Sequence, residues 1–145
     1  MQGACLTVTA RRGRILSFDV SGATRRVTTG LDGVGAVNLE KSLSLGDRLG
    51  GHLVTGHVDG VGVVVARSGS LLRVRLSRAL ARYVARKGSI CIDGVSLTIN
   101  RVKGDDFEVN LIPHTLKATT LERLAPGDRV NLEVDLIARY LERLL

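Results

Sequence analysis

Few side chains in this chain are able to act as a base, a nucleophile or a metal ligand. The histidines are His52, His57 and His114, and the cysteines are Cys5 and Cys91. The cysteines form no Cys-x-x-C pair and no Cys/His cluster, so the sequence indicates neither a zinc site nor a disulfide framework. It also shows no Ser-His-Asp or Cys-His constellation for nucleophilic catalysis. We therefore expect no metal.

The composition fits one ordinary domain or two small ones, because 145 residues with 44% hydrophobic content can bury a core. Aromatic residues make up only 3%, so Val, Leu and Ile must fill the interior, which suits β-strands. We expect no membrane span and no signal sequence, and a reduced cytoplasmic setting. The net charge of +7 comes mostly from scattered arginines without interleaved aromatics. We interpret it as a solvated basic surface rather than a nucleic-acid site.

The chain contains an internal repeat. Residues 3–9 (GACLTVT) recur as residues 94–100 (GVSLTIN). The same shift of 91 positions places Thr24, Thr28 and Thr29 on Thr115, Thr119 and Thr120. With a slightly larger shift, residues 37–40 match residues 130–133, because both are Val-Asn-Leu-Glu. Four matched blocks in one order predict two copies of one structural unit. The second copy has about forty residues before its first block and the first copy has two, so we expect a partial unit at 1–43, a complete unit at 44–134 and a helix at 135–145.

Alternating apolar residues and turn signals predict mostly β-structure. In the first unit we expect a hairpin of residues 6–9 and 15–20 and a short strand at 36–39. In the second unit we expect a short helix at 77–84 and strands at 57–66, 71–76, 89–92, 96–102, 107–112 and 129–134. Six short strands favour a closed antiparallel barrel, which leaves no exposed edges, whereas the half unit cannot close alone. The apolar stripe of the terminal helix must pack on its own barrel or on neighbouring copies.

Four stretches are closely similar to the riboflavin synthase family. They are residues 46–60 (GDRLGGHLVTGHVDG), 92–98 (IDGVSLT), 111–116 (LIPHTL) and 127–140 (GDRVNLEVDLIARY). The resemblance implies an all-β fold of tandem six-stranded Greek-key barrels that bind 6,7-dimethyl-8-ribityllumazine, followed by a helix that joins a homotrimer. It also implies transfer of a four-carbon unit between two lumazines, without cofactor or metal. The products are riboflavin and 5-amino-6-ribitylaminopyrimidinedione. The active site would lie between the N-terminal barrel of one subunit and the C-terminal barrel of the next.

The reaction starts with loss of a proton from a lumazine methyl group, so the site needs a modest base, donors for the resulting anion and a fixed stacked pose. By resemblance, the candidates for this polar work are His57, Asp93, Ser96 and Cys5. In the second unit the substrate-binding positions implied by the family are Gly56, His57, Val58, Lys87, Ser96, Leu97, Thr98, Leu111, Ile112, Pro113, His114, Thr115 and Leu116. In the first unit they are Cys5, Leu6, Thr7, Asp19, Val20, Ser21, Gly22, Ala23 and Thr24.

Several of these residues have a purely structural alternative. His57 could satisfy a carbonyl at a strand end, and Asp93 could be only the turn residue of an Asp-Gly hairpin. Lys87 could be a solvated lysine, and Cys5 a small buried apolar residue. His114 could cap backbone groups. We expect His52 to orient its loop and Cys91 to belong to the core.

The first unit departs from the family pattern. It lacks the Met-Phe-Thr-Gly-Ile-Val opening, it has Ser21, Gly22 and Ala23 where the family has a proline-containing loop, and residues 30–36 are two residues shorter. An alternative function is therefore a lumazine- or flavin-binding module without catalysis. A third possibility is an inert remnant that only oligomerises.

Overall fold

The computed structural model describes all 145 residues. Two strands, β1 (Val8–Arg12) and β2 (Ile15–Phe18), and the helix α1 (Gly22–Val27) precede a long segment without regular structure. The remaining strands form one closed antiparallel barrel in the order β3-β4-β7-β6-β5-β8. Their bounds are β3 Gly60–Ser68, β4 Leu71–Arg75, β5 Ser89–Ile92, β6 Val95–Lys103, β7 Asp106–Asn110 and β8 Arg129–Val134. The predicted all-β fold with a six-stranded Greek-key barrel is confirmed.

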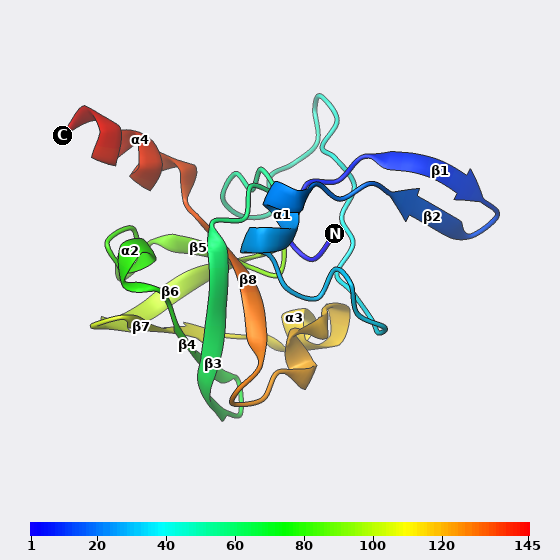
Figure 1. The fold of residues 1–145 in the computed structure, drawn as a ribbon. Helices are drawn as coiled ribbons and strands as arrows, with labels where there is room; N and C mark the ends of the chain where they lie inside the picture. The colour runs from blue at the N-terminus through cyan, green and yellow to red at the C-terminus, as the bar shows by residue number, and fades with distance from the viewer.

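Short helices connect the barrel strands. They are α2 (Arg78–Ala81), α3 (Pro113–Ala118) and the 3-10 helix η1 (Thr120–Arg123), and the chain ends with α4 (Leu136–Leu144). Figure 1 shows the β1–β2 ribbon extending from one side of the barrel and α4 from another. No helix is long and apolar enough to cross a membrane.

The barrel interior is filled almost entirely by aliphatic side chains, as the low aromatic content predicts. Phe107 on β7 is its one fully buried aromatic residue. Gly62 on β3 leaves room for this packing, because a Cβ there would lie 2.6 Å from a methyl group of Leu132 and 2.8 Å from one of Val74. Cys91 is buried on β5, as expected for a core residue, and burial raises the pKa of its thiol to about 12.

Most sequence-predicted elements are present with shifted ends. The strands at 89–92 and 129–134 match their predicted bounds, while the helix expected at 77–84 is limited to α2 after Ser77. Residues 111–112 are not part of β7, and residues 113–118 form the helix α3, with Pro113 at its start.

The strand expected at 36–39 is absent, so that prediction is wrong. Its sequence counterpart, β8, is held by hydrogen bonds to β3 and β5 on either side. Residues 1–59 contain no counterparts of β3 and β5, so this segment has no ladder to join. Instead, its backbone pairs with Gln2: the Asn38 N–H donates to Gln2 Oε1 at 2.8 Å, and the Asn38 carbonyl accepts from the Gln2 N–H at 2.9 Å.

The two copies of the repeated sequence have matching local geometry. Gln2 and Asp93 have φ of 50° and 48°, and the glycines after them have φ of 81° and 86°. Two asparagines at equivalent positions exchange hydrogen bonds between the copies. Asn131 Oδ1 accepts from the Thr29 N–H at 2.7 Å, and Asn38 Oδ1 accepts from the Thr120 N–H at 2.8 Å. The first copy is thereby attached to the barrel by a reciprocal pair of contacts.

Candidate functional site

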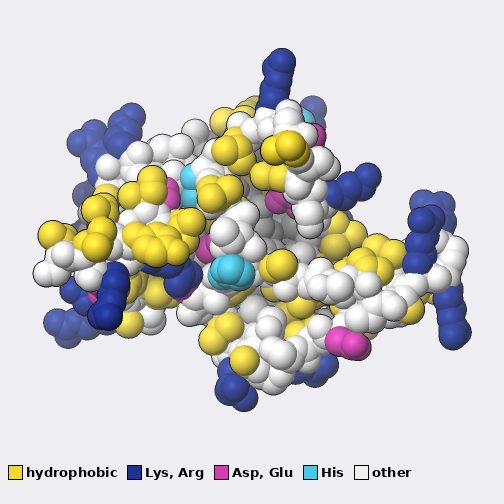
Figure 2. Space-filling view, turned by 90° about the horizontal axis from the view of Figure 1, so that it is seen from above, with side chains coloured by type: hydrophobic (Ala, Val, Ile, Leu, Met, Phe, Trp, Pro, Cys, Tyr) yellow, Lys and Arg dark blue, Asp and Glu magenta, His cyan; other side chains and the backbone are white.

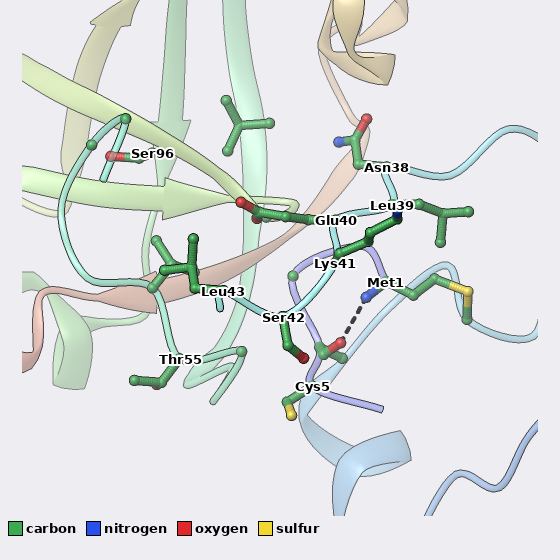
Figure 3. Close-up of a pocket in the computed structure, with 18 of the residues that line it drawn as sticks. Met1, Cys5, Asn38, Leu39, Glu40, Lys41, Ser42, Leu43, Thr55 and Ser96 are labelled. Atoms are coloured by element: carbon green, nitrogen blue, oxygen red, sulfur yellow. Dashed lines mark hydrogen bonds between the residues drawn. The ribbon is translucent and has the colours of Figure 1, made fainter. Parts of the chain in front are cut away.

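A cavity of about 780 Å³ lies where the N-terminal segment, the long connection before β3 and the start of β6 meet. Figure 3 shows the labelled side chains of Cys5, Glu40 and Ser96 arranged around it from these separate segments. Five of the sequence-predicted site residues line it: Cys5, Leu6, Gly56, Ser96 and His114. The cavity therefore brings residues of both repeat copies together. This volume is in the range of a small-molecule site.

The hydroxyl of Ser96 is already engaged by the connection before β3. It lies 2.7 Å from Nδ1 of His52 and also accepts a hydrogen bond from the His52 backbone N–H at 3.1 Å. Gly51 is pressed against the same side chain, because a Cβ at that position would lie 2.3 Å from Ser96 Oγ. His52 thus holds the connection before β3 against β6. This agrees with the expectation that His52 orients its loop.

Glu133 on β8 holds the segment that carries Gly56 and His57. Its buried carboxylate accepts hydrogen bonds from the Thr55 N–H at 2.8 Å, the Thr55 hydroxyl at 2.7 Å and the Gly56 N–H at 2.9 Å. The Gly56 carbonyl in turn accepts from the Cys5 N–H at 2.8 Å. A Cβ on Gly56 would lie 2.6 Å from Cys5 Cβ, so only glycine fits between the two copies here. The exposed His57 follows directly, outside the lining of the cavity.

Asp93 lies at the turn between β5 and β6, where Ile92 pairs with Val95, so it has the turn role expected of an Asp-Gly hairpin. The residue is only 2% exposed, and its side chain accepts a hydrogen bond from the Asn131 N–H at 2.8 Å. Burial raises the pKa of this carboxyl to about 6, opposed by that hydrogen bond. Asp93 lines a second cavity of about 410 Å³, together with Gln2 and Thr29, and not the one that contains Ser96.

The remaining predicted positions do not line the larger cavity. Leu97 and Leu111 belong to the barrel core, and Leu116 packs against it. Lys87 is exposed with φ of 70°, and its N–H donates to the Ile99 carbonyl. The others are exposed or half-buried at the surface: Thr7, Asp19, Val20, Ser21, Gly22, Ala23, Thr24, His57, Val58, Thr98, Ile112, Pro113 and Thr115. Ser21 is the N-cap of α1, since its hydroxyl accepts from the Thr24 N–H at 3.1 Å.

Charged residues that sequence reasoning missed also line the larger cavity: Glu40, Lys41 and Arg48. Glu40 corresponds to Glu133 in the repeated Val-Asn-Leu-Glu block, so the repeat itself was the signal that could have found both. The structure contains no group of three or more His, Cys, Asp or Glu side chains arranged to hold a metal ion.

A family model described as the Lumazine binding domain matches residues 55–135, which include the whole barrel. Riboflavin synthase of Chlamydia trachomatis is 45% identical over 141 residues, covering 96% of this chain and 71% of the relative. This chain belongs to the riboflavin synthase family. Riboflavin synthase of Mycobacterium tuberculosis is 52% identical over 116 residues, covering 75% of this chain but 58% of the relative. The match therefore spans little more than half the length of that relative.

Solved structures of the protein LumP have the same architecture as this family member. The complex of LumP with 6,7-dimethyl-8-(1'-D-ribityl) lumazine superposes with a TM-score of 0.75 at 26% identity, over 92% of this chain and 74% of LumP. The complex with riboflavin gives a TM-score of 0.80 at 27% identity, over 92% and 75% of the two chains.

Proposed function

We propose that this chain binds 6,7-dimethyl-8-ribityllumazine and acts as a riboflavin synthase, a transferase. In this reaction two lumazines yield one riboflavin and one 5-amino-6-ribitylaminopyrimidinedione. The observation that carries the proposal is the set of riboflavin synthases 40–52% identical to this chain. The cavity of about 780 Å³ supports it, because it joins family-matched residues of both repeat copies in one small-molecule-sized space.

The polar residues of the cavity suit the first step, removal of a methyl proton from an electron-poor pteridine. Ser96 and its partner His52 form a hydrogen-bonded pair at 2.7 Å that can donate to or accept from a bound ring. Arg48 and Lys41 supply positive charge for the anion that forms. His57 and Cys5 remain candidates for contact with the reacting centre. Asp93 lines the other cavity, so its proposed role is to position Ser96 by holding the turn between β5 and β6.

The proposal includes a homotrimer in the cytoplasm, with residues 1–43 and 44–134 as two lumazine-binding units and 135–145 as the assembly helix. Two apolar surfaces support assembly. Apolar side chains gather over α4 in Figure 2, and Ile137, Tyr140, Leu141 and Leu144 on this helix are exposed. On the β1–β2 ribbon, Val8 and Leu16 are 48% and 43% exposed, whereas their repeat counterparts Ile99 and Phe107 are fully buried.

A binding module without catalysis is the second candidate function. The structural likeness to LumP complexes with lumazine and riboflavin favours it, since those complexes hold a ligand on the same architecture. The first repeat copy also favours it, because it has two strands against the six of the closed barrel.

Incubation of the purified chain with 6,7-dimethyl-8-ribityllumazine separates the two candidates. Riboflavin formation, followed by absorbance and chromatography, is expected for a synthase and should be lost in His57→Ala. Lys117 is exposed on α3 and lies outside the cavity, so Lys117→Ala is the matched control. Bound lumazine without riboflavin would favour the module, and no binding at all would contradict both. Light scattering on the same sample tests the trimer.

A further inference from the structure

One side chain of the C-terminal helix α4 contacts residues 55–59, the segment that carries Gly56 and His57. Arg139 on α4 donates from its guanidinium to the backbone carbonyl of His57 at 3.2 Å. The same guanidinium nitrogen forms an ion pair with Asp59, two residues further along. The Asp59 side chain is 10% exposed and that of Arg139 is 38% exposed, so the pair is shielded on the Asp59 side.

Asp59 also fixes the point at which α4 leaves the barrel. Its other carboxylate oxygen accepts from the Val134 N–H at 2.8 Å, at the last residue of β8. Its own backbone N–H donates to the Leu132 carbonyl at 2.8 Å. The Asp59 side chain therefore joins β8, the start of β3 and α4 in one hydrogen-bonded junction.

The segment from 55 to 59 is held at both ends by different elements. At one end, the Glu133 carboxylate accepts hydrogen bonds from the Thr55 and Gly56 N–H groups. At the other end, the junction at Asp59 holds the segment. Between them, the His57 carbonyl has Arg139 as its hydrogen-bond partner. The position of the His57 backbone, and hence of its exposed ring, is thus set partly from α4.

We propose that Arg139 is a positioning residue that holds His57 in place for ligand binding and links the C-terminal helix to the ligand site. This inference rests on the proposed lumazine-binding function. Coupling of this kind is reciprocal, so docking of α4 favours the binding-competent His57 segment, and a bound ligand favours docking of α4.

A second attachment of α4 makes the role of Arg139 separable from docking of the helix. Glu142 accepts a hydrogen bond from the Tyr83 hydroxyl and pairs with Arg82 at 2.9 Å, and it forms no hydrogen bond or ion pair with residues 55–59. Loss of Arg139 alone leaves this attachment in place. It also leaves the shielded Asp59 carboxylate without its cation, which loosens the junction next to His57.

The experiment compares Arg139→Gln with two controls on the same helix. Arg143→Gln removes an exposed arginine that forms no ion pair, and Glu142→Gln weakens the second attachment by removing its ion pair with Arg82. Three properties are measured for each full-length variant: lumazine affinity by fluorescence titration, assembly by light scattering, and amide hydrogen exchange of residues 56–60 in the ligand-free protein.

We expect Arg139→Gln to weaken lumazine binding by about three- to tenfold, the range for a partly shielded charged hydrogen bond. Exchange at residues 56–60 should accelerate, while assembly is unchanged. Arg139→Lys, which keeps the charge but not the planar fork, should have a smaller effect. Arg143→Gln should match the parent chain.

Equal weakening in Glu142→Gln and Arg139→Gln would overturn the proposal, because the effect would then come from helix docking in general. Unchanged affinity and exchange in Arg139→Gln would overturn it as well. If the parent chain binds no lumazine, the proposed function fails. The exchange of residues 56–60 in the ligand-free variants then decides whether Arg139 holds the His57 segment, and unchanged exchange overturns that role too.

Discussion

Asp93 is a buried acid, and its replacement by asparagine should stabilise the protein at neutral pH. The residue is 2% exposed, and the pKa of its carboxyl is raised from 3.8 to about 6 because burial disfavours the charged form. Asparagine retains an oxygen that can accept from the Asn131 N–H, and it tolerates the positive φ of 48° at this position.

The direction in which Asp93 changes the free energy of unfolding follows from its pKa values in the unfolded and the folded chain. Below about pH 4, Asp93 is neutral in both the folded and the unfolded chain and carries no ionisation cost. Between about pH 4 and pH 6 it ionises in the unfolded chain first, so the free energy of unfolding falls as the pH rises. Above pH 6 the loss is complete and amounts to about 3 kcal/mol, at about 1.4 kcal/mol for each pKa unit. The added amide donors must find acceptors, so we expect a gain of about 1 to 3 kcal/mol for Asp93→Asn at pH 7.

Urea unfolding of both chains between pH 4 and pH 8 measures this difference. The stability gain of Asp93→Asn should be small at pH 4, grow up to about pH 6 and then stay constant. Asp105→Asn, in the exposed turn between β6 and β7, controls for the loss of one negative charge. A gain that does not change with pH, or a destabilised Asp93→Asn at pH 7, would refute the reasoning that Asp93 is held charged at a cost.

Of three further predictions, two test contacts between distant parts of the chain and the third tests the exposed apolar side of α4. Glu133→Gln should lower the free energy of unfolding by about 2 kcal/mol in urea titrations, because an amide group cannot accept all three hydrogen bonds now made to the carboxylate. Asn131→Ala should accelerate amide exchange at Thr29, and Asn38→Ala should do so at Thr120. Swapped or absent effects would contradict the reciprocal attachment. Leu141→Glu, at an exposed position of α4, should reduce the oligomer seen by light scattering without changing the unfolding midpoint.

The sequence predicted the fold well where local signals agree with the tertiary contacts. Alternating apolar residues and turn residues located all six barrel strands, and the Asp93 turn followed from its Asp-Gly pair. The segment 36–39 has the same pattern as its counterpart in β8, yet it forms no strand. A strand needs neighbours to bond with, and a local pattern cannot report whether they are present.

The candidate site was predictable only in part. Five of the residues carried over from the family line the larger cavity, but no local pattern indicated that Ser96 is hydrogen-bonded to His52, 44 residues earlier. The partners of Glu133 and Asn131 were also missed. These contacts join groups up to 129 residues apart, and spacing along the chain contains no information about such distances.

By itself, the sequence determined the family, the repeat pattern and the barrel strands, because hydrophobic periodicity and motif residues are local properties of the chain. Only the tertiary structure decided which polar groups meet. It placed Asp93 in a buried junction, Glu133 under the Gly56–His57 step and Arg139 on the carbonyl of His57. The physical reason is that buried polar groups must find partners, and closure of the barrel determines which partners are within reach.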